Sequence, residues 1–426
     1  MATSDGGGAG ERFRSVYLDH AATTPVRREV AEAMAHYMLT DYGNASSVHS
    51  FGRRAAEATE EARARVADLM GARPEEVVFM SGGTEADNMS IRGSLAAYSD
   101  RGRHVVTTKI EHHAVLHTCE ELEKEGLAEV TYLPVDRTAT VDPDDVAKAI
   151  RPDTVLVSVM FANNEVGTIQ PIMEIGRTCR EKGVLFHTDA VQAFGAVPFS
   201  VDEMGIDLMS VSSHKLYGPK GVGALYVRKG RRIRPLIHGG GHERKRRAGT
   251  SNVPGVVGFG LAAELARKEM DDRVRRLTAL RDRLIDGLLG RVEFSHLNGH
   301  PTRRLPNNVN VSFEFVEGES ILLSLDKKGI AASSGSACTS GSLEPSHVLL
   351  AMGIPPEVAH GSVRMTLGTQ NTDEDVDYVL EVLPGVIERL RAMSPLHAKA
   401  VAERAREAAG RPGERCESGP VTPGAR

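Results

Sequence analysis

The feature that most constrains the fold is a regular alternation of short β-branched runs with longer amphipathic stretches. Stretches with helical periodicity, such as Ala55 to Met70 and Ile172 to Lys182, separate the runs. Strands that alternate with helices indicate parallel pairing through crossover connections. We therefore predict an α/β fold, with strands in the runs at 77–80, 104–110, 154–162, 184–190, 207–213 and 223–229.

A change of texture after about Glu264 predicts a second structural unit. We expect a long charged helix through Leu289, strands around NNVNVSFEF, and a further helix near Asp373 to Ala392. The 426 residues are enough for two domains of ordinary size. The predicted division is a large domain at 27–264 and a smaller α+β domain made of 17–26 together with 265–405.

Both ends of the chain lack hydrophobic periodicity. We expect disordered tails at 1–16 and 406–426, because neither contains enough apolar residues to pack. Cys416 lies in the second tail and is interpreted as a free cysteine without a function.

Charge and composition bear on partners and compartment. The 52 Lys and Arg residues against 57 Asp and Glu give a formal net charge of -5, which favours a small-molecule substrate over nucleic acid. The basic run at 242–247 is read as a solvated loop. The start of the chain has no apolar core of a signal peptide, and no apolar run could span a membrane, so we expect a cytoplasmic protein. The four cysteines lack metal-ligand spacing, so no metal site is predicted.

A candidate phosphate site follows the first predicted strand of the large domain. The segment SGGTEADN places Gly83 and Thr84 at the N-terminus of a predicted helix. Free backbone N–H groups and the positive end of the helix dipole suit a phosphate there. Taken alone, the same segment also fits an ordinary tight turn with Thr84 as the helix cap.

Two polar side chains end later predicted strands. Asp189, in VLFHTDAVQAFG, would be costly to desolvate without a cationic partner, which could be a protonated pyridine nitrogen or one of the many arginines. Lys215, in SVSSHKLYGPKG, can lose its proton through desolvation and attack an aldehyde, although SSHK alone also fits a surface lysine. The order and approximate spacing of Thr84, Asp189 and Lys215 resemble those of fold-type I pyridoxal phosphate (PLP) enzymes.

Between roughly Tyr17 and Leu396 the chain resembles the NifS/IscS-type cysteine desulfurases of the class V aminotransferase family. The resemblance implies a fold-type I PLP-dependent transferase, with a large, mixed, mostly parallel sheet domain and a smaller α+β domain that carries the catalytic cysteine loop. His20 stands where many relatives have Asn, and Gly83 where Ala is frequent. The matching segments are YLDHAATTP, SGGTEADN, EHHAV, NNEVG, HTDAVQ, SSHKLYGPKG, HGGGHERKRRAGT and SSGSACTSGSLEPS.

The resemblance also implies how PLP would be bound. Lys215 would form the Schiff base, Asp189 would pair with the pyridine nitrogen, and Gln192 would hydrogen-bond the ring hydroxyl oxygen. His112 would stack on the ring and transfer protons. The residues implied around the phosphate are Gly83, Thr84, Ser212 and His214, with Thr250 reaching the phosphate of the neighbouring subunit in a homodimer.

The substrate implied by the resemblance is L-cysteine. Asn164 would contact the cofactor and the substrate, and Arg364 would bind the substrate carboxylate through a two-pronged ion pair. From the residues alone, a structural salt bridge is the better reading of Arg364. Cys338 would take the substrate sulfur as a persulfide and leave L-alanine, because its stretch of small residues favours an accessible thiol.

Several alternatives stay open on sequence grounds. The sulfur acceptor is expected to be a protein, either an iron–sulfur scaffold or a thiolation enzyme, with supply to tRNA thiolation or DNA phosphorothioation as further possibilities. Another PLP enzyme, such as a class V aminotransferase or a selenocysteine lyase, is the first rival. The second rival is a binding or scaffold protein that keeps the fold without the activity.

Overall fold

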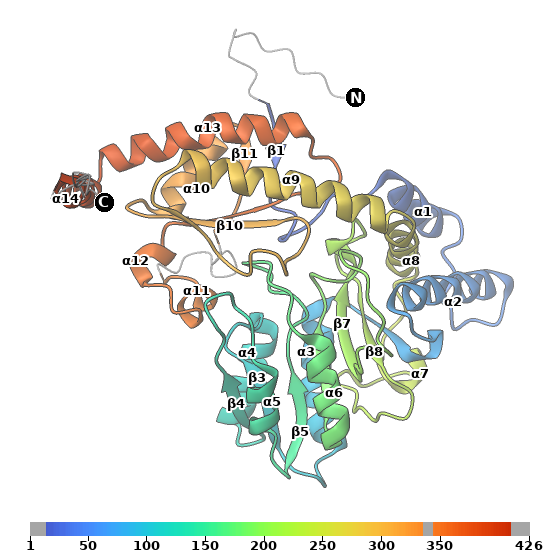
Figure 1. Ribbon diagram of the computed structural model, residues 1–426. Coiled ribbons are helices and arrows are strands. Elements are labelled where there is room, and N and C mark those ends of the chain that lie inside the picture. The colour runs from blue at the N-terminus through green and yellow to red at the C-terminus, as the bar shows by residue number, and fades with distance from the viewer. Residues whose placement is uncertain (1–13, 335–343, 410–426) are drawn as a thin grey trace, which may run out of the picture.

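A seven-stranded sheet forms the centre of the larger part of the molecule (Figure 1). The computed structural model describes residues 14–334 and 344–409. The strands of this sheet are β2 (Val77–Met80), β3 (His104–Thr108), β4 (Glu129–Leu133), β5 (Thr154–Ser158), β6 (Leu185–Asp189), β7 (Leu208–Ser212) and β8 (Gly223–Val227).

The strand order is β2-β8-β7-β6-β5-β3-β4. Strand β8 runs antiparallel to both of its neighbours, whereas the remaining pairs are parallel. The predicted α/β fold with a mixed, mostly parallel sheet is thus confirmed.

The degree of burial explains which strands could be predicted from the sequence. Every residue of β3, β5, β6, β7 and β8 is buried, because helices cover both faces of the sheet, and such strands are nearly continuous apolar runs. Strand β4 lies at the edge and is mostly half-exposed. Its sequence, EVTYL, mixes polar and apolar residues, and it was not predicted.

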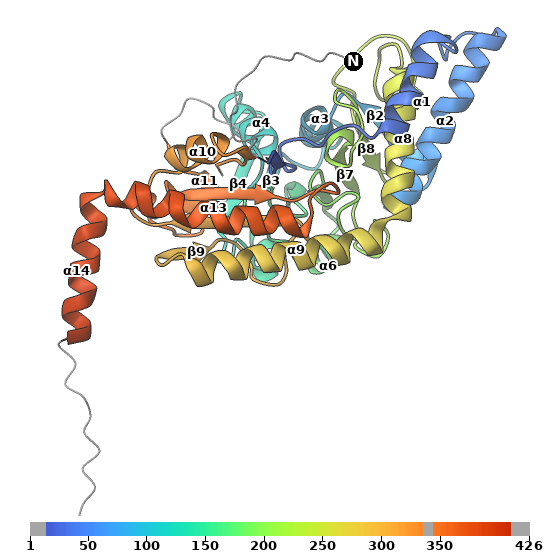
Figure 2. The ribbon, with the colours of Figure 1, turned by 90° about the horizontal axis from the view of Figure 1, so that it is seen from above.

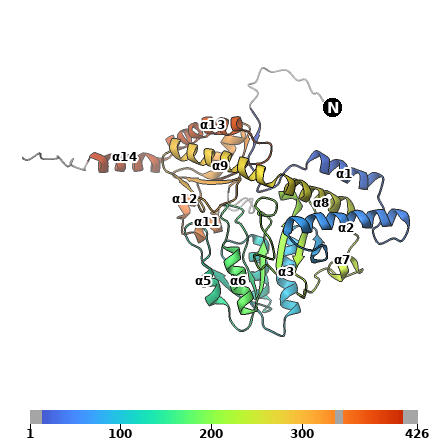
Figure 3. The ribbon, with the colours of Figure 1, turned by 45° about the vertical axis from the view of Figure 1, so that its right-hand side comes forward.

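Helices precede and connect these strands. Helix α8 packs against both α1 and α2 on one side of the molecule (Figure 3). Helix α6 has the predicted bounds. The helices of this part are α1 (Arg28–Leu39), α2 (Ser50–Met70), α3 (Gly83–Ala97), α4 (His113–Lys124), α5 (Pro143–Ala149), α6 (Ile172–Lys182), α7 (His242–Lys245) and α8 (Val253–Lys268).

The smaller part is built on a three-stranded antiparallel sheet in the order β12-β10-β9. Its strands are β9 (Ser295–Leu297), β10 (Asn308–Phe313) and β12 (Ser362–Thr366). Its helices are α9 (Met270–Arg291), α10 (Gly318–Asp326), α11 (His347–Ala351), α12 (Pro356–Ala359), α13 (Asp373–Ala392) and α14 (Pro395–Ala409). Helices α9 and α13 lie side by side (Figure 1), and α14 projects away from the rest (Figure 2).

The two parts have separate apolar cores. Most buried apolar residues from Leu277 onward pack in the core of the smaller part, whereas Ala266 and Met270 belong to that of the larger part. Val348 and Leu349 of α11 form a separate cluster with Ile110 and Met160 of the larger part. Val16 and Leu18 join the smaller core, and β1 (Val16–Tyr17) pairs in parallel with β11 (Ile330–Ala331). The division into 27–264 and 17–26 plus 265–405 stays a proposal, and Ala266 and Met270 pack on the larger side of its boundary.

The predicted tails are longer than the structure allows. Val16 already lies in β1, and Arg14 forms a 2.6 Å ion pair with Asp375, so the ordered chain begins inside the tail predicted at 1–16. Helix α14 continues to Ala409, past the predicted boundary at 405. Strand β1 was not predicted because it has only two residues, which show no periodicity, and it forms only by pairing with β11. Cys416 lies outside the described residues.

Candidate active site

A cavity of about 300 Å³ opens where the two parts of the molecule meet, at the C-terminal ends of the parallel strands. Ligands of open α/β sheets bind at this edge. Most of the predicted site residues line it, namely Gly83, Thr84, His112, Asn164, Asp189, Gln192, Ser212, His214, Lys215 and Arg364. The lining residues that were not predicted are Ala21, Ala22, Asp87, Met160, Ala162 and Val191.

The N-terminus of α3 forms one wall of the cavity. Within the described chain no side chain caps this helix, whose N-cap is Gly82, so its first N–H groups are available to an anion. A Cβ atom at Gly83 would lie 2.6 Å from Cγ2 of Val191, so a side chain here would require the Val191 side chain to shift. The side chains of Ser212 and His214 line the same cavity. This arrangement fits a phosphate group.

Asp189 ends β6 and is 6% exposed. One of its carboxylate oxygens, Oδ1, accepts a 2.9 Å hydrogen bond from the backbone N–H of Val191. Burial raises the pKa of Asp189 to about 6, although this bond and the nearby Lys215 oppose the rise. A cation at this position, such as a protonated pyridine nitrogen, would favour the ionised carboxylate.

Lys215 follows β7, in the short turn Ser213–Lys215. Its ammonium group donates hydrogen bonds to the carbonyl oxygens of Ala21 and Ala22, the second at 2.8 Å. Gln192 donates from Nε2 to the same Ala21 oxygen at 3.0 Å. The amine and the amide that sequence analysis assigned to the cofactor therefore meet at one turn of the N-terminal segment.

His112 is the N-cap residue of α4, and its Nδ1 accepts a 3.1 Å hydrogen bond from the N–H of Ala114. Burial, together with the positive charge of Lys215, lowers the pKa of His112 to about 4. The ring is therefore neutral near pH 7, with its proton on Nε2 because Nδ1 acts as the acceptor.

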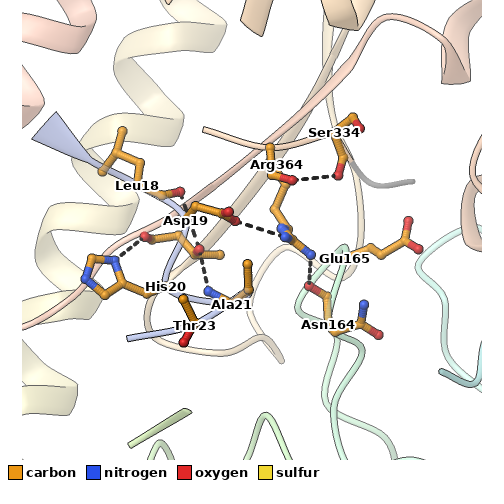
Figure 4. A network of polar contacts seen from close by, with 12 residues as sticks. Leu18, Asp19, His20, Ala21, Thr23, Asn164, Glu165, Ser334 and Arg364 are labelled. Carbon is orange, nitrogen blue, oxygen red and sulfur yellow. Dashed lines mark hydrogen bonds and ion pairs between the residues drawn. The ribbon is translucent and has the colours of Figure 1, made fainter. Parts of the chain in front are cut away.

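Arg364 lies in β12 and is 3% exposed. Its Nη1 donates to the carbonyl oxygen of Asn164 at 3.1 Å, and its Nη2 forms a 3.0 Å ion pair with Oδ1 of Asp19 (Figure 4). The structural salt bridge considered on sequence grounds thus exists, and Arg364 lines the cavity as well. The pairing with Asp19 was not predicted.

Two predicted site residues are not among those that line the cavity. Thr250 is exposed, in the loop after α7. Cys338 lies outside the described residues. The described cysteines, Cys119 and Cys179, are buried, and burial raises the pKa of both thiols, to about 12 for Cys119. Neither is suited to act as a nucleophile.

The unpredicted residues of the cavity carried weak signals. Asp19, Ala21 and Ala22 belong to YLDHAATTP, a segment that contributed to the resemblance without individual roles. Ala21 and Ala22 act through backbone carbonyl groups, which side-chain chemistry does not reveal. Asp87 lies one helical turn after Gly83, and only its spacing in SGGTEADN pointed toward the cavity.

The fold and the cavity together define a fold-type I PLP-dependent transferase, in which a lysine, a buried aspartate and a helix N-terminus converge at the edge of a mostly parallel sheet. The family model described as "Aminotransferase class-V" matches residues 16–379. The chain therefore belongs to the class V aminotransferase family, and its curated relatives place it among the IscS-type cysteine desulfurases.

Two of these relatives cover nearly the whole chain. "Cysteine desulfurase IscS" of Methanosarcina thermophila is 58% identical over 91% of this chain and 95% of its own length. The protein of the same name from Dictyoglomus turgidum is 56% identical over 90% of this chain and 97% of its own length.

Solved structures agree in fold. A "NifS-like protein" has a TM-score of 0.83 and 40% identity over 88% of this chain and all of its own. A structure titled "SspA in complex with cysteine" has a TM-score of 0.74 and 36% identity over 83% of this chain and 99% of its own.

Proposed function

We propose that this protein is a PLP-dependent cysteine desulfurase that converts L-cysteine to L-alanine and holds the released sulfur as a persulfide on Cys338. The observation that carries the proposal is the meeting of Lys215, Asp189, His112 and Arg364 in one cavity. These side chains supply an amine, a carboxylate, a neutral imidazole and a guanidinium, which is the set needed for amino-acid chemistry with PLP.

The residues that would hold the cofactor follow from the cavity. Lys215 would bind its aldehyde carbon, Asp189 would face its ring nitrogen, and Gln192 would bind the ring hydroxyl oxygen. His112 would stack on the ring, with Asn164 at its edge. When bound, PLP withdraws electrons from the α-carbon of an amino acid, so that a proton can leave that carbon. The phosphate would be held by Gly83, Thr84, Ser212 and His214, and by Thr250 of a second copy.

Each side chain then has a defined task. Arg364, helped by Asn164, would bind the substrate carboxylate and orient the α-carbon. The Lys215 amine would accept the α-proton, and the neutral His112, with its proton on Nε2, would transfer protons at the substrate. The Cys338 thiolate would attack the substrate sulfur, so that the carbon–sulfur bond breaks as a sulfur–sulfur bond forms. The sulfur is oxidised to the persulfide level, the carbon is reduced, and protons complete L-alanine.

The proposed homodimer is supported by exposed apolar side chains at the C-terminal end of α1 and in the segment that follows. Leu39 is 79% exposed and Val48 is 89% exposed. Large apolar side chains this exposed favour an interface with a second copy. Thr250 is also exposed and thus available to the active site of a second copy.

The proposed sulfur acceptor is a protein of iron–sulfur cluster assembly or a thiolation enzyme, and the relatives named IscS support the first. We propose a cytoplasmic location. Of the residues that the structure describes, no helix is both long and apolar enough to cross a membrane.

The test is to incubate the PLP-loaded protein with L-cysteine and a reductant, and to assay alanine and sulfide. The wild type should release both, whereas Cys338→Ala should release no sulfide although it still binds cysteine. Equal sulfide from both proteins would contradict the persulfide step. Transamination that survives in Cys338→Ala would instead favour an aminotransferase.

A further inference from the structure

The turn from Asp19 to Ala22 lies between Arg364, which would bind the substrate, and Lys215 and Gln192, which would bind the cofactor. At one end Asp19 holds Nη2 of Arg364 at 3.0 Å. At the other, the carbonyl oxygen of Ala21 accepts hydrogen bonds from Gln192 and Lys215. Figure 4 shows the turn beside Arg364. A displacement of this turn would therefore change the substrate end and the cofactor end together.

His20, the middle residue of this turn, is 3% exposed and fixed through both ring nitrogens. Its Nδ1 lies 2.8 Å from the carbonyl oxygen of Thr366, and its Nε2 lies 2.7 Å from Nε2 of Gln370. A carbonyl oxygen can only accept, so Nδ1 carries the hydrogen. Nε2 of the neutral ring then accepts from the Gln370 amide. Burial lowers the pKa of His20, which also favours the neutral ring.

Packing leaves the His20 ring little freedom. Tyr17 contacts it edge-on at 4.8 Å between ring centroids. A Cβ atom at Gly368 would lie only 2.1 Å from Nε2 of His20, so the ring occupies the space that a side chain there would need. The next residue, Ala21, donates its N–H to Oγ1 of Thr366 at 2.8 Å. His20 thus ties the turn to β12 and to the loop that follows it.

We propose that His20 is a positioning residue. It fixes the Asp19–Ala22 turn, and through this turn it fixes the positions of Arg364, Lys215 and Gln192 relative to one another. This inference rests on the proposed function and deepens it. It assigns a role to one of the two residues at which the sequence departs from many relatives. His20 is not among the residues that line the cavity, so it would act through the turn and not on the substrate.

The test compares two variants with a matched control. His20→Ala removes both ring hydrogen bonds, and Gln370→Ala removes one of them while it leaves the ring in place. His104→Ala is the control, because His104 is also fully buried and bonded through both nitrogens, at 2.7 Å to Thr154 and 2.9 Å to Thr131. His104 begins β3, at the far end of the sheet from the cavity.

Three quantities are measured on each holoenzyme: the rate of PLP loss into a trapping solution, KM and kcat for L-cysteine, and the midpoint of thermal unfolding. We expect His20→Ala to lose PLP about tenfold faster and to raise KM about fivefold, and Gln370→Ala to change both about threefold in the same direction. His104→Ala should lower the midpoint but leave the rate of PLP loss and KM unchanged.

The outcomes separate the inference from the proposed function. A wild type that neither binds PLP nor forms alanine would refute the proposed function. If the wild type is active but His20→Ala only lowers the unfolding midpoint, as the control does, the positioning role is wrong. If His20→Ala does not fold, Gln370→Ala decides, and an unchanged PLP loss rate together with an unchanged KM would overturn the inference.

Discussion

The Asp87 carboxyl lies 3.6 Å from the imidazole of His187, measured from Oδ1 to Nε2, and both side chains are buried beside Asp189. The ring is already bonded to Ser158 and Ser210, and burial lowers the pKa of His187 to about 3, so it cannot offset a negative charge. Burial raises the pKa of Asp87 well above its usual value, and the negative charge of the neighbouring Asp189 adds a smaller rise. Asp87 therefore holds a proton when Asp189 is ionised.

This relationship predicts that Asp87→Asn stabilises the protein at neutral pH. In the unfolded wild type, Asp87 loses its proton above its ordinary pKa, whereas in the folded state it keeps that proton up to its raised pKa. The free energy of unfolding therefore falls as the pH rises from the unfolded pKa of Asp87 to its folded pKa. The neutral amide removes this dependence, worth about 1.4 kcal/mol per pH unit in that window. Urea unfolding at several pH values between 4 and 8 measures it. Parallel stability profiles for the two proteins would contradict the assignment, and Asp87→Ala, which leaves a cavity, should be less stable throughout.

A second prediction concerns His112. Because its Nδ1 is committed to the N–H of Ala114, only Nε2 can exchange a proton with the substrate. We expect His112→Ala to lower kcat by about 100-fold or more with a smaller change in KM, since Arg364 still binds the carboxylate. Steady-state alanine formation measures both constants. The pKa of about 4 also predicts that loss of wild-type activity between pH 6 and 5 does not come from His112. A wild-type acid limb in that range that disappears in His112→Gln would be evidence against this reading.

Much of the larger sheet could be predicted because its strands are buried on both faces and so appear as uninterrupted apolar runs. Strand β4, at the edge, gave no such run. The ends of α6 were predicted to the residue, and α13 was predicted near its observed bounds. The amphipathic pattern of α6 ends at Gly183, its C-cap, and that of α13 begins after the capping box at Thr372.

The candidate site was predictable where side-chain chemistry sets the role, as for Lys215 and Asp189. It was not predictable where long-range contacts set the role. The pairing of Asp19 with Arg364 joins residues 345 positions apart, and Ala21 contributes only its carbonyl group. The charge state of Asp87 depends on its burial and on Asp189 of another element. No local pattern in the sequence encodes these contacts.

A third prediction tests the carboxylate site. Arg364→Lys keeps the positive charge but cannot reach both Asp19 and the Asn164 carbonyl oxygen in the planar geometry of a guanidinium. We expect KM for L-cysteine to rise about tenfold or more, with less effect on kcat. Arg304→Lys is the control, because Arg304 is equally buried at 3% exposure and its hydrogen bonds go to neutral acceptors of the protein. It should lower stability without a change in KM. Equal KM values in Arg364→Lys and the wild type would remove Arg364 from the substrate site.

A fourth prediction tests the proposed dimer. Charged substitutions of Leu39 and Val48, as in the double variant Leu39→Glu and Val48→Glu, should convert the dimer to monomers, because the charges would be buried in an apolar interface. Sedimentation velocity measures the oligomeric state. Leu323→Glu is the control, since Leu323 is 60% exposed on α10 in the smaller part of the molecule. A wild-type monomer, or a double variant that remains dimeric, would contradict this interface.

A fifth prediction concerns the loop that carries Thr250. The short element α7, just before this loop, contains three consecutive non-glycine residues in the left-handed region, with φ of 47° at Glu243, 55° at Arg244 and 65° at Lys245. This conformation is unfavourable for residues with a Cβ atom, so another contact must hold it. The Glu243 carboxylate binds Arg63 through both oxygens, at 2.7 and 3.0 Å, and also accepts the N–H of Phe79 at 2.9 Å.

Glu243→Gln should therefore destabilise the protein by about 3 kcal/mol, because the Arg63 side chain is 5% exposed and would lose its buried partner. Glu60→Gln is a matched control on the same arginine. Glu60 pairs with Nε of Arg63 at 3.0 Å but is itself 55% exposed, so its loss should cost less than about 1 kcal/mol. Chemical denaturation measures both variants. If the two costs are equal, the buried ion pair does not hold the turn. If they differ as expected, Glu243→Gln should also lose PLP faster, because Thr250 would no longer be held where the phosphate of a second copy can meet it.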